Sequence, residues 1–368
     1  MKRSAVLLIV AVVVVGLFAA CGGGGGEAAA AEEGEQAQME TYSWIVQSCF
    51  PNNMPLTERT IALWAEKVGE MSGGQLDITL HGAGEIVPGP EVFDAVRDGA
   101  LDAGMNTPAW QKGEFPAGDL FYTLPGGITE FHDLFVWEWG YGGKDLEQEM
   151  YGDEIVVFPL GLTPPEQFWA NRDIQSVGGF EGLKVRSAGL SMDLWQALGG
   201  SPVLLSGGEV VPSLQRGVID AAEFAFPSMD VPLGLPDVAN YVYGPPIHMG
   251  SNKFQLVINP EKWAELPDHL KSIVENAATA ATFEGYAQEW IATFESFQEM
   301  QEMEDLTIQK LPQDVQQQAI DLAFQILEEK SAEDEFFAKV WESQKSFLQD
   351  YQPYYEFSSF DVSPGQLE

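Results

Sequence analysis

One pattern occurs twice in this sequence and constrains the fold more than any other feature. Residues 84–103 predict a loop, a helix, a glycine and a strand in that order, and residues 208–221 predict the same series. In each copy a glycine, Gly99 or Gly217, follows the helix, where a left-handed residue commonly ends it. The two copies favour two lobes on a similar βαβ plan, with a ligand cleft between them. Because the spacing between the parts differs, two independent βαβ units are the alternative.

Short apolar segments alternate with helical ones along the rest of the chain. Residues 76–80 alternate like a half-buried strand, and residues 155–158 and 255–258 are apolar runs typical of buried strands. Residues 57–71 and 270–303 carry apolar side chains at helical spacing, and another such helix follows Pro312. This alternation predicts an α/β fold with mixed sheets. The long C-terminal helices are predicted to be scaffold rather than site.

The first 21 residues have the features of a secretory signal. Lys2 and Arg3 precede an apolar run that is short for a membrane span, and small residues lead into Cys21. The end of this segment resembles a bacterial lipobox, which implies that Cys21 is lipidated, although Phe18 stands where the box usually carries leucine. A cut elsewhere nearby and a plain membrane anchor are the alternatives. In each case we expect the folded part to lie outside the cytoplasm.

The segment after Cys21 predicts a tether rather than a folded region. Residues 22–41 are rich in Gly, Ala, Glu and Gln and hold few large apolar side chains. A short Ala-rich helix is the alternative. Cys49 is the only other cysteine, so with Cys21 lipidated no disulfide framework is expected in this exported protein. A metal site built on cysteine is excluded for the same reason.

The charge of the chain limits its partners. It holds 56 acidic and 18 basic residues, a formal net charge of -38. Such a surface repels nucleic acid and anionic lipid headgroups, so neither is an expected partner. An anionic ligand must enter against this field, and it therefore requires a local basic group in a cleft.

No motif of an enzyme is present. The four histidines are scattered and form no metal-ligand spacing, and no nucleophile elbow or phosphate-binding loop occurs. The expectation from motifs alone is therefore a protein that is not an enzyme.

Two residues at predicted strand ends could meet a charged ligand. Arg186 ends a short strand and precedes a Ser/Gly loop that opens a helix, where a guanidinium can grip a carboxylate with two hydrogen bonds. Glu223 follows the predicted strand at residues 218–222 and stands among aromatic residues, so it is either solvated or neutralised by a cation. A surface arginine paired with an acid, and an exposed glutamate, are the plainer alternatives.

Taken together, these stretches resemble the extracytoplasmic solute-binding proteins of tripartite ATP-independent periplasmic (TRAP) transporters. The resemblance runs from about residue 44 to residue 327. The landmarks that carry it, in order, are residues 70–74, 84–88, 93–96, 182–186, 198–199, 213–215 and 217–220. Further stretches, Gly207 to Glu209, Glu223 before an aromatic residue, and His248, are similar to the branch that binds 2-oxo or 2-hydroxy acids with a metal ion.

The resemblance assigns roles to residues of this chain. It implies that Arg186 holds the substrate carboxylate and that Gln167 contacts both substrate and cation. Glu223 and the backbone carbonyl of Phe224 would complete the cation shell. Phe224 stands where the branch usually has tryptophan and reshapes the pocket wall. Met249 also faces the substrate, and it stands where an acidic residue is expected. Because a thioether is a poor ligand for hard ions, Na⁺ is favoured over Ca²⁺.

The resemblance also implies an architecture and a mode of action. Two α/β lobes of the periplasmic-binding-protein type close on the ligand like a flytrap, with one long helix spanning both. Residues 42–161 and about 252–300 would form lobe I, and residues 162–251 and about 301–368 lobe II. The protein would deliver a small carboxylate to a TRAP membrane permease, held at the membrane only by its lipid. A metal-assisted enzyme acting on a keto acid and a sensor of a signalling system are the alternatives.

Overall fold

The computed structural model describes residues 40–122, 131–205 and 207–358. The predicted signal segment with Cys21, and all but the last residues of the predicted tether, lie outside these ranges. No helix within them is long and apolar enough to cross a membrane.

The first sheet has five strands in the order β2-β1-β3-β10-β4. Strand β1 pairs in parallel with β2 and β3, whereas β10 pairs antiparallel with β3 and β4. The three strands predicted from apolar patterns all lie in this sheet. The bounds are β1 (Tyr42–Gln47), β2 (Leu76–His81), β3 (Ala103–Asn106), β4 (Val156–Leu162) and β10 (Lys253–Ile258).

The second sheet has six strands in the order β11-β9-β5-β8-β6-β7. Strand β6 pairs in parallel with β7 and β8, and β5 pairs antiparallel with β8 and β9. Strand β11 is added in parallel at the edge beside β9. The bounds are β5 (Phe168–Ala170), β6 (Lys184–Arg186), β7 (Ser201–Val203), β8 (Ala221–Glu223), β9 (Tyr241–Gly244) and β11 (Thr307–Lys310).

The two sheets share one plan, as the internal repeat predicts. The order β7-β6-β8-β5-β9 reproduces β2-β1-β3-β10-β4, with the same parallel and antiparallel pairs. Gly99 and Gly217 have φ of 77° and 67°, and each ends its helix in the left-handed region. Asp102 and Asp220 then make the same contact: each carboxylate accepts a backbone N–H of the neighbouring strand, at 2.6 Å and 3.0 Å.

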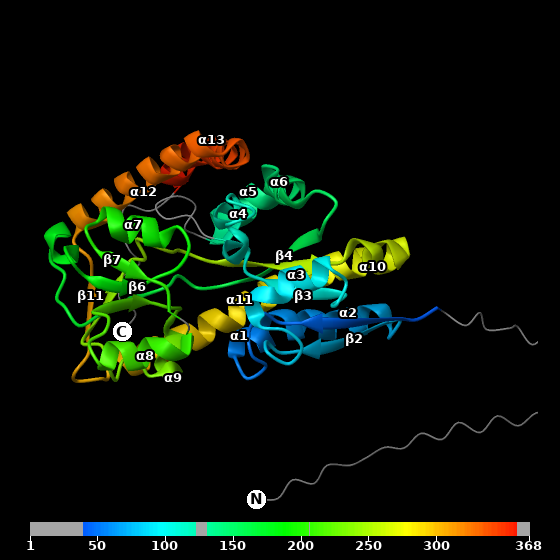
Figure 1. The fold of residues 1–368 in the computed structure, drawn as a ribbon, viewed down its shortest axis with the longest axis horizontal. Helices are drawn as coiled ribbons and strands as arrows, with labels where there is room; N and C mark the ends of the chain where they lie inside the picture. Colours follow the sequence, from blue (N-terminus) through cyan, green and yellow to red (C-terminus); the bar gives the residue numbers. More distant parts are fainter. Residues whose placement is uncertain (1–39, 123–130, 206, 359–368) are drawn as a thin grey trace, which may run out of the picture. The chain divides into compact units, whose positions relative to one another are not determined.

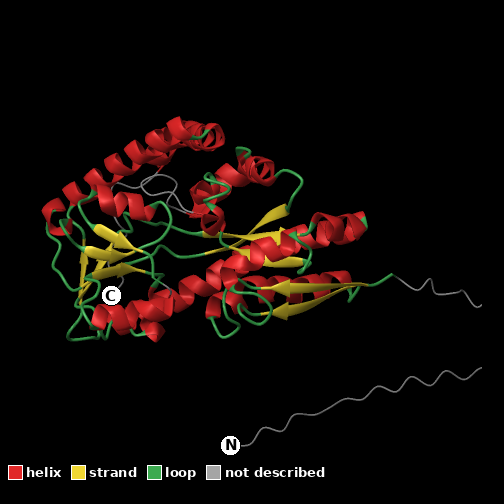
Figure 2. Cartoon of the chain, in the orientation of Figure 1, coloured by secondary structure: helices red, strands yellow, loops and turns green. Residues whose placement is uncertain are grey.

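Helices cover both sheets, and Figure 1 labels them along the chain (Figure 2 shows the same view by secondary structure). The predicted helix at residues 57–71 forms, but its first part is a π-helix, η1 (Glu58–Ala62), between α1 (Pro55–Thr57) and α2 (Leu63–Ser72). The remaining bounds are η2 (Gly89–Glu91), α3 (Val92–Arg97), η3 (Pro108–Gln111), α4 (Gly118–Tyr122), α5 (Phe131–Gly140), α6 (Gly143–Tyr151), η4 (Val177–Phe180), α7 (Ser191–Ala197), α8 (Gly207–Gln215), α9 (Pro227–Leu233) and α10 (Pro260–Glu265).

Three long helices form the C-terminal third; the first two were predicted, and the third was not. They are α11 (Asp268–Gln301), α12 (Gln313–Glu333) and α13 (Glu335–Ser358). The 34-residue α11 contacts α2, η1 and β4 beside the first sheet and α9 beside the second (Figure 1). Helix α12 packs on α7, whereas α13 packs on α4 and α6 beside the first sheet. The exact lobe boundaries stay a prediction.

Buried side chains form separate cores around the sheets. The alternation of β5 divides the second sheet's core in two, because neighbouring residues of a strand point to opposite faces. Phe168 packs with Trp195 on one face, and Trp169 packs with Leu214 on the other. The core of the first sheet includes side chains of α11 and α13.

The close contact between α11 and η1 predicts that adding one methyl group at Gly285 strongly lowers the stability of the protein. A Cβ at Gly285 would lie 1.8 Å from the backbone oxygen of Arg59, so Gly285→Ala must displace one of two packed helices. We expect a loss of unfolding free energy of at least about 2 kcal/mol, as for other overpacked cores. Gly69→Ala in α2 is the matched control, since a Cβ there meets no atom within 4 Å. It should stabilise the protein by up to about 1 kcal/mol through helix propensity. Denaturant titration of both variants measures the difference, and equal stabilities would contradict the packing described here.

Candidate functional site

The site lies where the chain crosses between its two sheets. One crossing runs from β4 to β5 and contains Glu166 and Gln167; the other runs from β9 to β10 and contains His248 and Met249. Two hydrogen bonds of 3.0 Å join the crossings: the backbone N–H of Thr163 donates to the carbonyl of Asn252, and the backbone N–H of Asn252 donates to Oγ1 of Thr163. Side chains that are far apart in the sequence therefore meet here.

The strands of the second sheet bring Arg186 and Glu223 to the same place. Arg186 ends β6 and Glu223 ends β8, and these parallel strands are paired so that Arg186 lies opposite Ala222. The carboxyl ends of parallel strands share one edge of a sheet, which is where ligands commonly bind. Gln167 joins the same edge because its backbone N–H donates to the carbonyl of Ala225 at 3.1 Å.

Backbone carbonyls hold the Arg186 side chain. Its Nη1 donates to the carbonyl of Glu223 at 2.7 Å, and its Nε donates to that of Leu205 at 3.3 Å. The guanidinium also lies over the ring of Phe224, 5.2 Å from its centre. Within the described ranges Arg186 forms no ion pair with a carboxylate. Its orientation is therefore set by neutral groups, and its positive charge remains available to an anion.

Glu223 is buried, with 1% of its surface exposed. One carboxylate oxygen, Oε1, accepts the backbone N–H of Ala188 at 3.0 Å. The other, Oε2, lies 3.4 Å from Nε2 of His248. Burial raises the pKa of Glu223 to about 6, and the charge of Arg186 opposes that rise. Burial also lowers the pKa of His248 to about 3, so the imidazole is neutral and the contact is not an ion pair.

Glu166 is a site residue that sequence reasoning missed. Its carboxylate is buried and accepts a hydrogen bond of 2.6 Å from Nδ2 of Asn252. Ligand atoms of Glu166, Glu223 and His248 all lie within 4.8 Å of one another. Burial, followed by the charges of Glu223 and Asp230, raises the pKa of Glu166 well above its ordinary value. The only sequence feature that pointed to Glu166 is its position next to Gln167, the predicted ligand.

The other predicted residues are chain neighbours of this cluster. The Nε2 of Gln167 donates to the carbonyl of Pro165 at 3.0 Å, which aims its amide within the crossing. Met249 is buried and directly follows His248, and Phe224 is half-buried. The ring of His248 packs against Trp195, with ring centres 5.4 Å apart.

Several buried polar atoms of the cluster lack a hydrogen-bond partner. Among the described residues, none pairs with Oε1 of Gln167, Oε2 of Glu223 or either ring nitrogen of His248. An unpaired buried polar atom is costly, so each such atom calls for an explanation. Carboxylate and amide oxygens are the ligands that Na⁺ and Ca²⁺ prefer. The donor set therefore fits a hard cation, and the neutral imidazole nitrogen could add one more ligand.

A third buried carboxyl group, that of Asp230, lies close enough to the cluster to affect Glu166. Asp230 is fully buried and accepts a 2.7 Å hydrogen bond from Nε1 of Trp169. Burial raises the pKa of Asp230 to about 8, while the charge of Arg186 partly opposes this rise. Glu166, Glu223 and Asp230 thus share a single arginine. Additional positive charge would relieve their mutual repulsion.

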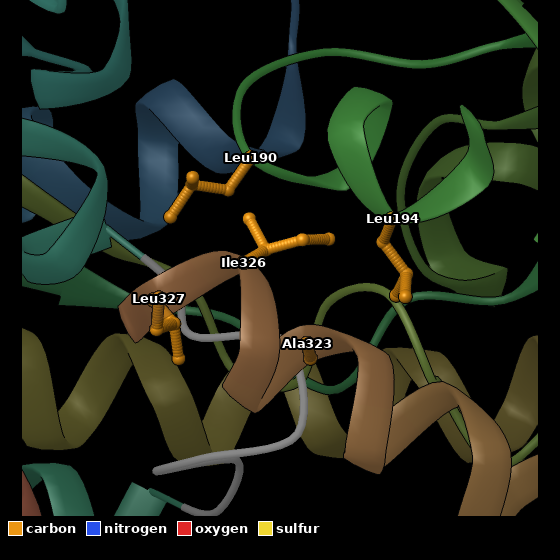
Figure 3. A pocket seen from close by; sticks show the side chains of 5 residues that line it. All are labelled: Leu190, Leu194, Ala323, Ile326 and Leu327. Atoms are coloured by element: carbon orange, nitrogen blue, oxygen red, sulfur yellow. The ribbon is translucent and has the colours of Figure 1, made fainter. Parts of the chain in front are cut away.

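An apolar hollow between α7 and α12 is a separate feature (Figure 3). Its lining is entirely aliphatic and consists of Leu190, Leu194, Ala323, Ile326 and Leu327. Without a polar group it cannot orient a carboxylate. This hollow is therefore not a candidate for the carboxylate site.

Asp119 of α4 faces the loop that follows Arg186. A Cβ at Gly189 would lie 3.1 Å from Oδ1 of Asp119, so the two segments touch. Burial raises the pKa of Asp119 from 3.8 to about 7. The folded protein thus holds this proton more tightly than the unfolded chain does. Its stabilising contribution is complete below pH ~4 and is lost as the pH rises through 7.

Replacing Asp119 tests this titration. Asp119→Asn removes the charge, so the variant should gain thermal stability over the parent by at least about 2 °C at pH 8.5 and much less at pH 5. Calorimetric unfolding at both pH values measures the change. Asp77→Asn, at an exposed position of β2, is the control and should shift the midpoint equally at both pH values. A gain for Asp119→Asn that does not depend on pH would contradict the assignment.

Comparisons with known proteins identify the family of this chain. A family model described as bacterial extracellular solute-binding protein, family 7, matches residues 47–334. A monocarboxylate 2-oxoacid-binding periplasmic protein of Nostoc sp. is 29% identical over 316 residues, which cover 85% of each chain.

Two solved structures are close in fold. Both are TRAP periplasmic solute-binding proteins. One, from Colwellia psychrerythraea with bound calcium and pyruvate, has a TM-score of 0.82 at 26% identity over 87% of this chain and 98% of its own. The other, from Pseudoalteromonas atlantica with bound sodium and pyruvate, has a TM-score of 0.81 at 28% identity over 87% of this chain and 97% of its own. The predicted fold class, an α/β binding-protein fold with a long helix, is confirmed.

Proposed function

This chain belongs to family 7 of the bacterial extracellular solute-binding proteins, and we propose that it captures a small 2-oxo or 2-hydroxy monocarboxylate for a TRAP transporter. The fold and the relatives make it a TRAP solute-binding protein. Its ligand would be bound outside the cytoplasm and passed to the membrane permease. The relatives named with pyruvate or 2-oxoacids support this choice of ligand.

One observation carries the proposal: Arg186 is oriented but not neutralised. Its Nε and Nη1 are held by two carbonyls, and no ion pair with a described carboxylate consumes its charge. The rest of the guanidinium can donate to a ligand carboxylate by charge-assisted hydrogen bonds. In a chain of net charge -38, this is the local basic group that an anionic ligand requires.

A cation would be held beside the ligand by four groups of this chain. They are the carboxylates of Glu166 and Glu223, Oε1 of Gln167 and the backbone carbonyl of Phe224. When bound, Na⁺ or Ca²⁺ supplies positive charge and free coordination positions for oxygens of the ligand. Phe224 and Met249 would form the apolar wall that limits the size of the acid.

Motion would follow from the position of the site at the crossings. We assign residues 42–161 and about 252–300 to one lobe and most of the remaining folded chain to the other, with α13 packed beside the first lobe and α11 as the shared spine. Glu166 is bonded to Asn252 next to β10, whereas Arg186 and Glu223 end strands of the second sheet. A ligand touching these groups would stabilise the closed state, which the permease then recognises.

The proposed role is delivery without turnover. Members of the family are substrate-binding proteins, and Arg186 and Glu223 have the roles of anchors rather than of acid and base. Incubating the protein with 2-oxo acids and assaying for products separates this role from an enzyme, and any catalytic product would overturn it. A sensor would bind the same ligands, but its deletion would abolish a response rather than uptake.

The first test replaces the proposed carboxylate anchor. Arg186→Lys keeps the charge but loses the planar fork, so affinity for pyruvate should fall at least tenfold, about 1.4 kcal/mol. Titration calorimetry with pyruvate, lactate and larger 2-oxo acids measures it. Arg172→Lys is the matched control, because Arg172 also donates to two backbone carbonyls but lies outside the site. Equal pyruvate affinity in Arg186→Lys and the parent protein would refute the assignment.

The second test concerns attachment to the membrane. With Cys21 lipidated, Cys21→Ser should move the protein from the membrane fraction to the soluble extracytoplasmic fraction while leaving pyruvate affinity unchanged. Cys49→Ser, at the other cysteine, should not release it. Mass spectrometry of the mature N-terminus reads the modification directly, and an unmodified start beyond Cys21 would exclude a lipid anchor.

A further inference from the structure

The second half of α11 exposes aromatic side chains and buries small or polar ones. Between residues 285 and 293 the buried positions are Gly285, Glu289 and Thr293. Trp290 and Phe294, which lie on the opposite side of the same turns, are exposed. A helix at the surface of a protein normally does the reverse, because its apolar stripe faces the core. The packing of this chain therefore does not explain the aromatic residues at these exposed positions.

The exposed apolar residues form a regular stripe. Phe283, Ala287, Trp290, Phe294 and Phe297 follow one another at alternating intervals of four and three residues, and all are exposed. At 3.6 residues per turn they lie within about 80° of one another around the helix axis. Intervals of four and three residues define the a and d positions of a coiled coil, where a second helix packs. We call these five residues the α11 seam.

Most of the seam faces solvent. Phe283, at one end, contacts Phe135 of α5, with ring centres 5.0 Å apart. The side chains of Trp290, Phe294 and Phe297 are 36%, 49% and 36% exposed. The 21-residue α12, by comparison, exposes a single large hydrophobic side chain. Contiguous exposed apolar surface of this kind marks an interaction site more often than a chance arrangement.

The residues beside the seam are acidic. Glu295 and Glu299 are exposed, and neither forms an ion pair within the described ranges. Glu284 is also exposed, and it is paired with Lys67 of α2 at 2.5 Å. Residues 272–309 contain no lysine or arginine. Charges at the positions that flank a seam set the choice of partner, so these glutamates favour a partner with lysine or arginine at its flanks.

We propose that the α11 seam is a docking surface for one amphipathic helix of another protein, with an apolar seam and basic flanks. The two helices would lie side by side, and the aromatic side chains of α11 would be the anchors of the interface. The seam is a different surface from the cluster at the crossings. The inference therefore goes beyond the proposed function and does not depend on it.

Charge argues against the other occupants of this surface. Two copies of this chain would bring their acidic flanks together, and each copy has a formal net charge of -38. Residues 22–41 and 359–368 of the same chain contain no lysine or arginine that could pair with the flank. Helices that lie on membranes carry lysine and arginine beside their apolar face, whereas the flank here is acidic.

The test uses a synthetic helix as the probe. It has about three heptads, with leucine at a and d and lysine at e and g. Titration calorimetry at physiological ionic strength should show binding to the parent protein. A peptide of the same composition in scrambled order should bind at least tenfold more weakly, because it has the charge but not the seam.

Two variants of α11 should weaken binding of the probe. Ala287→Lys places a positive charge in the seam without removing a packed side chain, so affinity should fall at least tenfold. Ala332→Lys, at an exposed position of α12, adds the same charge elsewhere and is the matched control, which should bind like the parent. Phe294→Ser removes one half-exposed anchor and should also weaken binding, with pyruvate affinity unchanged.

Four results would overturn the inference. Equal affinity of Ala287→Lys and Ala332→Lys for the probe would show that the seam is not used. Equal binding of the scrambled peptide would reduce the effect to net charge. Sedimentation of the parent as a dimer that Phe294→Ser dissociates would assign the seam to a second copy. Co-sedimentation of the parent with phosphatidylcholine and phosphatidylglycerol vesicles, lost in Phe294→Ser, would assign it to a membrane.

Discussion

Burial of like charges is the constraint around which the site is built. Glu166, Glu223 and Asp230 are almost fully removed from water beside one arginine. Desolvation opposes the ionisation of all three, and repulsion from Glu223 and Asp230 adds to it at Glu166, which is why their pKa values are all raised. Hydrogen bonds from Asn252, Ala188 and Trp169 offset part of this cost. A bound cation would lower the unfavourable free energy that these hydrogen bonds leave. A site of this kind gains stability when it is filled.

The repeated sheet plan explains where the charged residues stand. In the pairing register, Arg186 of β6 occupies the position that Gln47 holds in β1. The amide of Gln47 is satisfied by backbone groups of Ile86 and Val87, so it closes a loop of its own lobe. Arg186 stands at the same strand end with an unneutralised charge. The same strand position thus holds a loop in the first sheet and presents a charged side chain in the second.

The long helix links these parts mechanically. Glu289 of α11 is fully buried, and its Oε2 accepts two hydrogen bonds. Nη1 of Arg59 in η1 donates at 2.8 Å, and the hydroxyl of Ser228 in α9 donates at 3.1 Å. Ser228 follows the segment of Glu223 and Phe224 in the chain. The helix that contacts both sheets is therefore bonded to the region next to the site. In the proposed flytrap, this arrangement lets α11 act as the spine about which the lobes move.

The sequence by itself determined the α/β class, both copies of the helix–glycine–strand unit, the first two long C-terminal helices and the strand ends at Arg186 and Glu223. These follow from local periodicity and from the few residues that tolerate a left-handed backbone, which are visible without any knowledge of contacts. Only the tertiary structure decided that Glu166 joins Glu223 and His248. The same holds for the packing of α13 beside the first sheet and for the burial of Asp119 away from solvent. Each depends on partners far away in the chain, such as Asn252, which lies 86 residues from Glu166. Burial and charge are properties of the assembled neighbours, so no local pattern could report them.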